Sequence, residues 1–257
     1  MDRRTFTKAA AMGIGALPLL HRLGPPVRGS APMKLAMVMY PGMYPLDLVG
    51  PHAVLSGALE THLVWKDRHT LLASGIPFTA TTTFAECPAD VDMLFVPGGT
   101  RGTLAAMQDE EVLTFLADRA PRASYITSVC TGSLVLGAAG LLKGRRATSH
   151  WGVRDSILPL LGATPVAERV VTDGNVVTGA GVSAGIDLAL TLLARIAGET
   201  VAKRTQLNIE YDPQPPFHAG SPEAAGPEIT AAMVAAYAEF SRGAAVAARG
   251  SRRARAG

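Results

Sequence analysis

Apolar and polar residues divide the chain into two alternating kinds of segment. Short, continuous apolar runs are typical of strands buried on both faces of a sheet. Such runs occupy residues 34–40, 91–96 and 124–130. Longer segments with helical spacing occupy residues 103–120, the stretch after 131 and residues 181–195. This alternation predicts an α/β fold with a doubly wound, mainly parallel sheet.

Four weaker patterns complete this outline of the fold. We expect a loop that runs into a helix at 46–55, a short strand at 69–74 and a β-rich edge segment at 79–84. Residues 169–178 read as a hairpin, because Asp173-Gly174-Asn175 is a typical turn sequence between two runs of β-branched residues.

The two ends of the chain differ in composition from its middle. Arg3-Arg4, Phe6 and Lys8 precede an apolar run at 9–20, which matches a twin-arginine export signal and is too short to span a bilayer. The alternative is a disordered basic N-terminus. Residues 242–257 are mainly Ala, Arg and Gly, and we expect a disordered basic tail. We therefore predict a leader at 1–31, a catalytic domain at 32–241 and a periplasmic or otherwise exported protein that meets the membrane only in transit.

The distribution of charge argues against nucleic acid as a partner. The whole chain has a net charge of +3, with +4 on residues 1–31 and +5 on residues 242–257. Residues 32–241 therefore carry −6. A nucleic-acid-binding domain needs a basic surface on its folded part, and this body is acidic.

The strongest candidate for chemistry is Cys130, in the sequence S-V-C-T-G-S. An apolar strand ends at this cysteine and a helix follows at once, which is the pattern of a nucleophile elbow at the carboxyl edge of a sheet. We expect the N-terminus of that helix to lower the pKa of the thiol. We also expect Gly132 to leave room for a ligand. A buried structural cysteine is the alternative.

Other candidates lie near the ends of the predicted strands. Gly98 and Gly99 follow a strand in P-G-G, and their N–H groups are candidate oxyanion donors, although a plain turn is possible. Asp47 is a candidate acid or base, or a helix N-cap. His150 and Trp151 are candidate substrate-binding residues, with a packed imidazole as the alternative to a base.

The chain has two cysteines, Cys87 and Cys130, which leaves open a disulfide or one reactive thiol beside one buried thiol. No group of Cys and His residues has the spacing of metal ligands, and no phosphate-binding G-x-x-x-x-G-K-[ST] sequence occurs. We therefore expect no metal and no cofactor.

These blocks resemble the ThiJ/PfpI superfamily over most of residues 33–220. P-L-D-L-V-G-P, F-V-P-G-G, S-V-C-T-G-S with R-A-T-S-H-W after it, and E-Y-D-P-Q-P-P-F are most similar to its isonitrile hydratase branch. The resemblance implies a flavodoxin-like, class I glutamine amidotransferase-like sandwich and a homodimer. It also implies that Cys130 is the nucleophile, Asp47 the acid/base carboxylate and Thr131 a helper beside the thiol.

The resemblance further implies a cofactor-free hydro-lyase that adds water to a small isonitrile. Three related groups fit less well. Peptidase-like members carry His after the nucleophile, where this chain has Thr131, and amidotransferases need a His-x-Glu pair that is absent after Cys130. The related regulators continue into a DNA-binding domain, for which the residues after Asp212 are too few. A redox-sensing thiol protein remains an alternative, because an exposed thiol of low pKa is easily oxidised.

Overall fold

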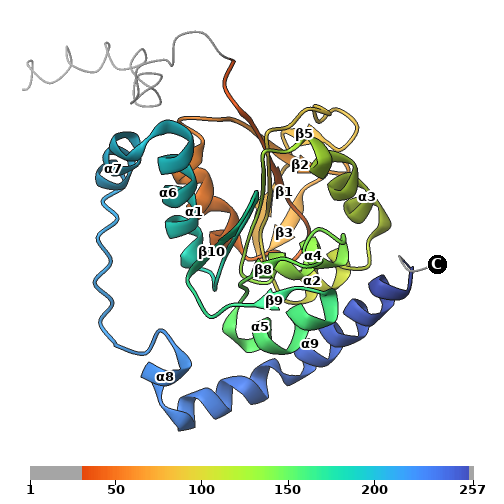
Figure 1. Cartoon of the computed structure of the whole chain (residues 1–257), viewed down its shortest axis with the longest axis vertical. Coiled ribbons are helices and arrows are strands. Elements are labelled where there is room, and N and C mark those ends of the chain that lie inside the picture. Colours follow the sequence, from red (N-terminus) through yellow and green to blue (C-terminus); the bar gives the residue numbers. More distant parts are fainter. Residues whose placement is uncertain (1–30, 255–257) are drawn as a thin grey trace, which may run out of the picture.

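A computed structural model of the protein describes residues 31–254, which form a seven-stranded sheet in the order β10-β11-β7-β6-β1-β2-β5 (Figure 1). All neighbouring strands of this sheet are parallel except β10 and β11. The doubly wound, mainly parallel sheet is therefore confirmed. The strands are β1 (Lys34–Val38), β2 (Glu60–Trp65), β5 (Thr82–Thr83), β6 (Met93–Val96), β7 (Tyr125–Val129), β10 (Val170–Asp173) and β11 (Val176–Gly179).

Helices cover both faces of the sheet (Figure 1). On one side lie α1 (Pro45–Leu55) and α6 (Ala184–Ala197), and α7 (Glu199–Asn208) packs against α6. The helices on the other side are α2 (Arg101–Ala106), α3 (Glu110–Arg119), α4 (Gly132–Ala138), α5 (Trp151–Ile157) and α9 (Pro227–Ala254). Short elements complete the fold: α8 (Pro222–Ala225), the 3-10 turns Ala120–Arg122 and Leu158–Leu161, and the strand pairs β3 (Leu71–Ala73) with β4 (Ile76–Phe78) and β8 (Arg146–Ala147) with β9 (Thr164–Pro165).

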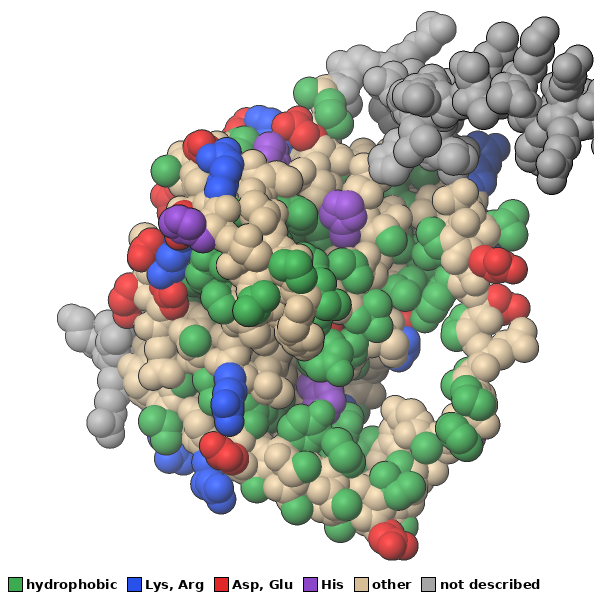
Figure 2. All heavy atoms as spheres, turned by 180° about the vertical axis from the view of Figure 1, so that it is seen from behind, with side chains coloured by type: hydrophobic (Ala, Val, Ile, Leu, Met, Phe, Trp, Pro, Cys, Tyr) green, Lys and Arg blue, Asp and Glu red, His purple; other side chains and the backbone are tan. Residues whose placement is uncertain are grey.

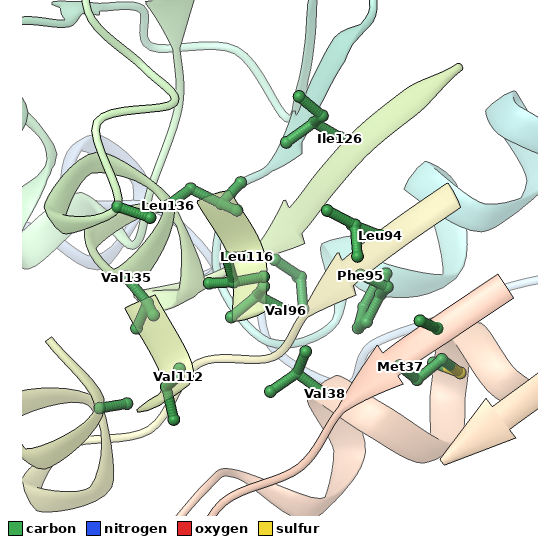
Figure 3. Close-up of a cluster of buried hydrophobic side chains, with 14 of the residues drawn as sticks. Met37, Val38, Leu94, Phe95, Val96, Val112, Leu116, Ile126, Val135 and Leu136 are labelled. Atoms are coloured by element: carbon green, nitrogen blue, oxygen red, sulfur yellow. The ribbon is translucent and has the colours of Figure 1, made fainter. Parts of the chain in front are cut away.

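The core lies between the central strands and the helices that follow them (Figure 3). Each central strand is apolar on both faces, because helices exclude water from both sides of a parallel sheet. The buried side chains drawn in Figure 3 include Met37, Val38, Leu94, Phe95 and Val96 from β1 and β6, and Val112, Leu116, Val135 and Leu136 from α3 and α4.

The predicted strands at 34–40, 91–96 and 124–130 and the hairpin at 169–178 are confirmed as β1, β6, β7 and β10–β11. The strand β2 was missed, because its first half, Glu60-Thr61-His62, is polar and only Val64 and Trp65 are buried. The short strand predicted at 69–74 exists as β3, but it pairs with β4 outside the main sheet.

The single helix predicted at 103–120 was wrong, since the segment forms α2 and α3 with a break between them. Asp109 is the N-cap of α3, because its side chain accepts hydrogen bonds from the N–H groups of Glu111 and Val112. An N-cap of this kind satisfies amide groups that a continuous helix would bond internally.

The disordered tail predicted at 242–257 was also wrong where the structure describes it. Helix α9 continues to Ala254, and it buries Phe240, Ala244, Ala247 and Ala248 against the body. These residues repeat at helical spacing and therefore share one face of α9. Three of them are alanines, whose small side chains let the helix approach α4 and α5 closely. The predicted leader at 1–31 lies outside the described residues, apart from its last residue.

The segment between α7 and α9 stands away from the rest of the molecule. Residues 212–220 are exposed, and Figure 2 shows an opening between this segment and the body. Within residues 31–254, no helix combines the length and the apolar character that crossing a membrane would require.

Candidate active site

Three predicted site residues lie at one edge of the sheet. Asp47, Gly98 and Cys130 follow β1, β6 and β7, and these strands are neighbours in the sheet. Because parallel strands present their carboxyl ends at the same edge, the fold brings together side chains that are far apart in the sequence. The chain runs from β1 toward β2 and from β6 toward β7, in opposite directions along the sheet, and ligands bind at such a point in open α/β folds.

Cys130 occupies a strained turn between β7 and α4. Its φ is +56°, which is uncommon for a residue other than glycine. Its N–H donates to the carbonyl oxygens of Gly179 at 3.1 Å and Ala180 at 2.6 Å. Its own carbonyl oxygen accepts from the hydroxyl groups of Ser133 at 3.2 Å and Ser149 at 3.0 Å. These bonds hold the backbone in a conformation that it would otherwise leave.

Gly132 permits the close packing of this elbow on the neighbouring strand. A Cβ atom at this position would lie 2.2 Å from the carbonyl oxygen of Val96 and 2.7 Å from that of Pro97. Space at Gly132 was expected for a ligand, but the backbone at the end of β6 fills it. The glycine therefore serves the assembly of the site.

Asp47 is completely buried in the first turn of α1, whose N-cap position belongs to Tyr44. Its Oδ2 accepts a hydrogen bond of 2.8 Å from the N–H of Gly98. Among the described residues, Oδ1 has no nitrogen or oxygen partner. Burial raises the pKa of Asp47 to about 7, and hydrogen bonds with Gly98 and with the Cys130 thiol oppose that rise. Asp47 is thus not the N-cap but a buried carboxyl group beside the cysteine.

The electrostatic environment of Cys130 differs from the one predicted. We expected the helix N-terminus to lower the pKa of the thiol. Burial and the charge of Asp47 instead raise its pKa well above the usual value, and hydrogen bonds from Thr131 offset only part of that rise. The cysteine is 5% exposed, and desolvation of a thiolate outweighs a short helix here. Ionisation of the Cys130 thiol therefore depends on transfer of its proton to Asp47.

The N–H groups of Gly98 and Gly99 are both engaged by side chains. Gly98 donates to Asp47, and Gly99 donates to the Thr131 hydroxyl at 2.9 Å. A Cβ atom on Gly98 would lie 2.6 Å from the Thr131 nitrogen and 2.8 Å from Asp47 Oδ2. In this arrangement the two glycines orient the acid and the threonine, rather than offering free donors to an intermediate.

Thr131 belongs to a buried network behind the thiol. Its hydroxyl donates to the carbonyl oxygen of Gly99 at 2.7 Å and lies 2.9 Å from the hydroxyl of Thr103. The Thr103 hydroxyl lies 3.3 Å from that of Tyr40, which donates to the carbonyl oxygen of Pro97 at 2.5 Å. Tyr40 and Thr103 carried no functional signal in the sequence, because neither lies in a motif.

His150 is packed among aromatic side chains. Its Nδ1 accepts a hydrogen bond of 3.2 Å from the N–H of Gly152 and so caps α5. Its ring centroid lies 5.5 Å from that of Trp151 and 5.0 Å from that of Tyr237. Burial lowers the pKa of His150, so the ring is neutral near pH 7. The hydrogen bond of this imidazole goes to Gly152 rather than to Cys130.

The remaining candidates for chemistry are few in the described part of the chain. Cys87 and Cys130 are both free and buried, so the alternative of a disulfide between them is wrong for this structure. In residues 31–254, no three His, Cys, Asp or Glu side chains are grouped so that they could hold a metal ion.

Comparisons with known proteins agree with this geometry. The model of the DJ-1/PfpI family matches residues 33–195, which is more than half of the sequence. The chain belongs to the DJ-1/PfpI family. The fold is accordingly the flavodoxin-like, class I glutamine amidotransferase-like sandwich that the resemblance implied.

Three proteins that are similar to this chain have different names. An isonitrile hydratase of Pseudomonas putida is 50% identical over 196 residues, which are 75% of this chain and 85% of that protein. The crystal structure of a ThiJ/PfpI family protein from Pseudomonas syringae has a TM-score of 0.83 and 46% identity, and the match covers 89% of this chain and 99% of that one. The HTH-type transcriptional regulator CdhR of Pseudomonas aeruginosa is 31% identical over 64% of this chain and 51% of its own length.

Part of the site lies beyond the span that the DJ-1/PfpI family model matches. Tyr237 belongs to α9, whereas the match ends at residue 195. The sequence carried no signal for this residue, because no motif surrounds Tyr237. Only the folded chain shows that it reaches His150.

Proposed function

We propose that this protein adds water to isonitriles and releases N-substituted formamides, with Cys130 as nucleophile and Asp47 as the group that moves protons. The observation that carries the proposal is the buried carboxyl group of Asp47 beside the Cys130 thiol. The 50% identical isonitrile hydratase of Pseudomonas putida supports the same chemistry. An isonitrile carbon needs one nucleophile and one proton, and this pair of side chains supplies both.

The first step joins the thiol to the substrate. The Asp47 carboxylate takes the thiol proton, and the Cys130 sulfur forms a bond to the terminal carbon of R–N≡C. Asp47 then returns the proton to that same carbon. The product is a thioimidate, R–N=CH–S–Cys130, and its formation consumes no additional proton.

The second step consumes one water molecule. Asp47 takes a proton from the water while the oxygen bonds to the thioimidate carbon, and it passes that proton to the nitrogen. Asp47 then takes the proton of the new hydroxyl group as the C=O bond forms and the carbon–sulfur bond breaks, and it gives this second proton to the sulfur. The products are R–NH–CHO and the free thiol, so the net reaction is the addition of one water to one isonitrile.

The glycines and Thr131 have supporting roles in this proposal. The N–H of Gly98 keeps the Asp47 carboxyl in place, while the backbone N–H of Thr131 interacts with the sulfur and lowers the pKa of the thiol. The strained elbow fixes the sulfur relative to the carboxyl. Such orientation of reacting groups is a substantial part of enzymatic catalysis.

Formation of formamide from cyclohexyl isonitrile by the purified, reduced protein tests the proposal. Cys130→Ala should abolish turnover, whereas Cys87→Ala serves as the matched control and should retain it. Asp47→Asn should lower kcat by about a hundredfold or more, the usual contribution of a general acid–base group. Thr131→Val should have a smaller effect, because it removes only the hydroxyl that bonds Gly99 and leaves the backbone N–H of residue 131 beside the sulfur.

The result that would overturn the proposal is also specific. Absence of formamide from several alkyl and aryl isonitriles, with release of ammonia from glutamine, would favour an amidotransferase-like hydrolase. Absence of both activities, together with ready and reversible oxidation of Cys130 by peroxide, would favour a redox-sensing protein.

A further inference from the structure

Tyr237 connects the C-terminal helix α9 to the candidate active site. Its ring packs edge-on against two other rings, at 5.0 Å from His150 with an interplanar angle of 60° and at 6.1 Å from Trp151 with an angle of 88°. Gly152 leaves room for this contact, because a Cβ atom there would lie 3.3 Å from Tyr237 Cδ2. The three side chains form one cluster, which we call the aromatic cluster.

Two sets of contacts place the aromatic cluster beside the nucleophile. Ser149 precedes His150 and donates to the Cys130 carbonyl oxygen at 3.0 Å. On the other side of the imidazole, a Cβ atom on Gly181 would lie 3.3 Å from His150 Cδ2. Gly181 directly follows Ala180, whose carbonyl oxygen accepts the Cys130 N–H at 2.6 Å. His150 is therefore held between two segments that each bond to Cys130.

The electrostatic effects on Tyr237 agree with this position. Partial burial, the neighbouring Cys130 and Tyr44 each raise the pKa of its hydroxyl. Tyr44 stands at the start of α1 and is 47% exposed. Tyr237 is thus within electrostatic reach of both the thiol and Tyr44, which come from distant parts of the chain.

The aromatic cluster is apolar and carries no formal charge near pH 7. Burial lowers the pKa of His150, and the pKa of Tyr237 is raised, so both rings are neutral there. His150, Trp151 and Tyr237 are all partly buried, which leaves aromatic surface available to a ligand. Offset and edge-on contacts between rings are favourable beyond the area that they bury.

We infer that Tyr237, held by His150 and Trp151, is a specificity-determining residue that favours isonitriles with an uncharged aromatic side group over small alkyl isonitriles. This inference rests on the proposed function, and it names the substrate class of the same site. The ring of Tyr237 makes the contact, and its hydroxyl is not needed for the preference.

The test compares kcat/KM for benzyl isonitrile and for ethyl isonitrile. In Tyr237→Ala the preference for the benzyl substrate should fall by about fivefold or more, the effect of losing one aromatic contact. Tyr237→Phe should keep the preference within about twofold, because the ring remains. Val246→Ala lies on the same helix, with Val246 69% exposed, and serves as a control that should behave like the unaltered protein.

A second measurement does not depend on hydration. Alkylation of Cys130 by N-benzyliodoacetamide, relative to iodoacetamide, should show the same dependence on Tyr237. Thermal unfolding of Tyr237→Leu, which keeps an apolar side chain, should resemble that of the unaltered protein, while its benzyl preference in alkylation falls.

Distinct results overturn the inference and the proposed function. An unchanged benzyl preference in Tyr237→Ala, or a loss in Tyr237→Phe as large as in Tyr237→Ala, would overturn the inference. If no isonitrile is hydrated while benzyl alkylation still depends on Tyr237, the proposed reaction fails and the aromatic selectivity of the site stands.

Discussion

The carboxyl group of Asp47 lies beside the thiol of Cys130 in the interior of the protein, and the two groups perturb each other's protonation. Burial is the largest influence on both, and it opposes the charged form of each. One proton shared by the pair avoids two adjacent buried negative charges. The pair therefore titrates as a unit in which Asp47 loses its proton first.

We expect the activity to depend on the protonation of this pair. Below pH 7 both groups hold protons and neither can accept one, so kcat/KM should be low. As pH rises through the Asp47 pKa of about 7, the form with a single proton accumulates and kcat/KM should rise. A pH–rate profile of the unaltered protein and of Asp47→Asn checks this. The residual activity of the variant should lack the rise near pH 7, and a rise retained there would contradict the assignment.

The same pKa predicts an effect on stability. Because folding raises the Asp47 pKa from 3.8 to about 7, the folded state prefers the protonated form, and stability is lost as pH rises through that interval. Asp47→Asn cannot ionise, so it should be more stable than the unaltered protein at pH 8, by up to about 4 kcal/mol.

Urea unfolding at pH 4.5 and pH 8 measures this difference. Near pH 4.5 the two proteins should be nearly equal, because the buried carboxyl is then protonated. Asp155→Asn, which removes an exposed carboxylate that pairs with Arg154, is the control and should show no comparable gain at pH 8. A gain in stability of Asp47→Asn over the unaltered protein that is larger at pH 4.5 than at pH 8 would contradict the predicted sign.

The sequence predicted where the site lies better than how its groups behave. Apolar runs that end shortly before Asp47 and Gly98 and at Cys130 were sufficient to place them at one sheet edge, because strand direction follows from the alternation with helices. The thiol pKa was predicted in the wrong direction, since desolvation depends on distant segments that cover Cys130. Tyr237 was missed for a related reason: its contact with His150 joins residues far apart in the sequence, and no motif marks it.

Labelling of the two cysteines should distinguish their environments. Both thiols are buried and have raised pKa values, but Cys130 can pass its proton to Asp47, whereas Cys87 has only Arg119 as a charged influence. Iodoacetamide near neutral pH should therefore modify Cys130 first, as peptide mass spectrometry can show. Asp47→Asn should slow that modification. Equal rates at the two cysteines would remove the basis of the proposed mechanism.

Export is a separate prediction, made from the leader sequence alone. Arg3 and Arg4 with the following apolar run should direct the protein through the twin-arginine route. Replacing both arginines by lysine should leave the protein in the cytoplasm, as fractionation and immunoblotting would show. Finding the unaltered protein only in the cytoplasmic fraction would contradict the prediction.

A homodimer is the last prediction, and surface residues of the structure give it a physical basis. Several large apolar side chains are exposed on α7, on the segment that stands off the body and on α9: Leu207 is 81% exposed, Phe217 79%, Ile229 55% and Val234 54%. Exposed apolar surface of this kind is typical of protein–protein contacts.

Light scattering at micromolar concentration should give about twice the chain mass of 26.7 kDa, less any leader that is removed. Phe217→Ser should shift the equilibrium toward the monomer, because a hydroxymethyl group replaces a ring that the dimer contact would bury. Leu72→Ser, at a residue that is 61% exposed on the separate β3–β4 hairpin, is the control and should leave the mass unchanged. A mass near that of one chain for the unaltered protein would rule out a stable dimer, and equal effects of both substitutions would place the contact elsewhere.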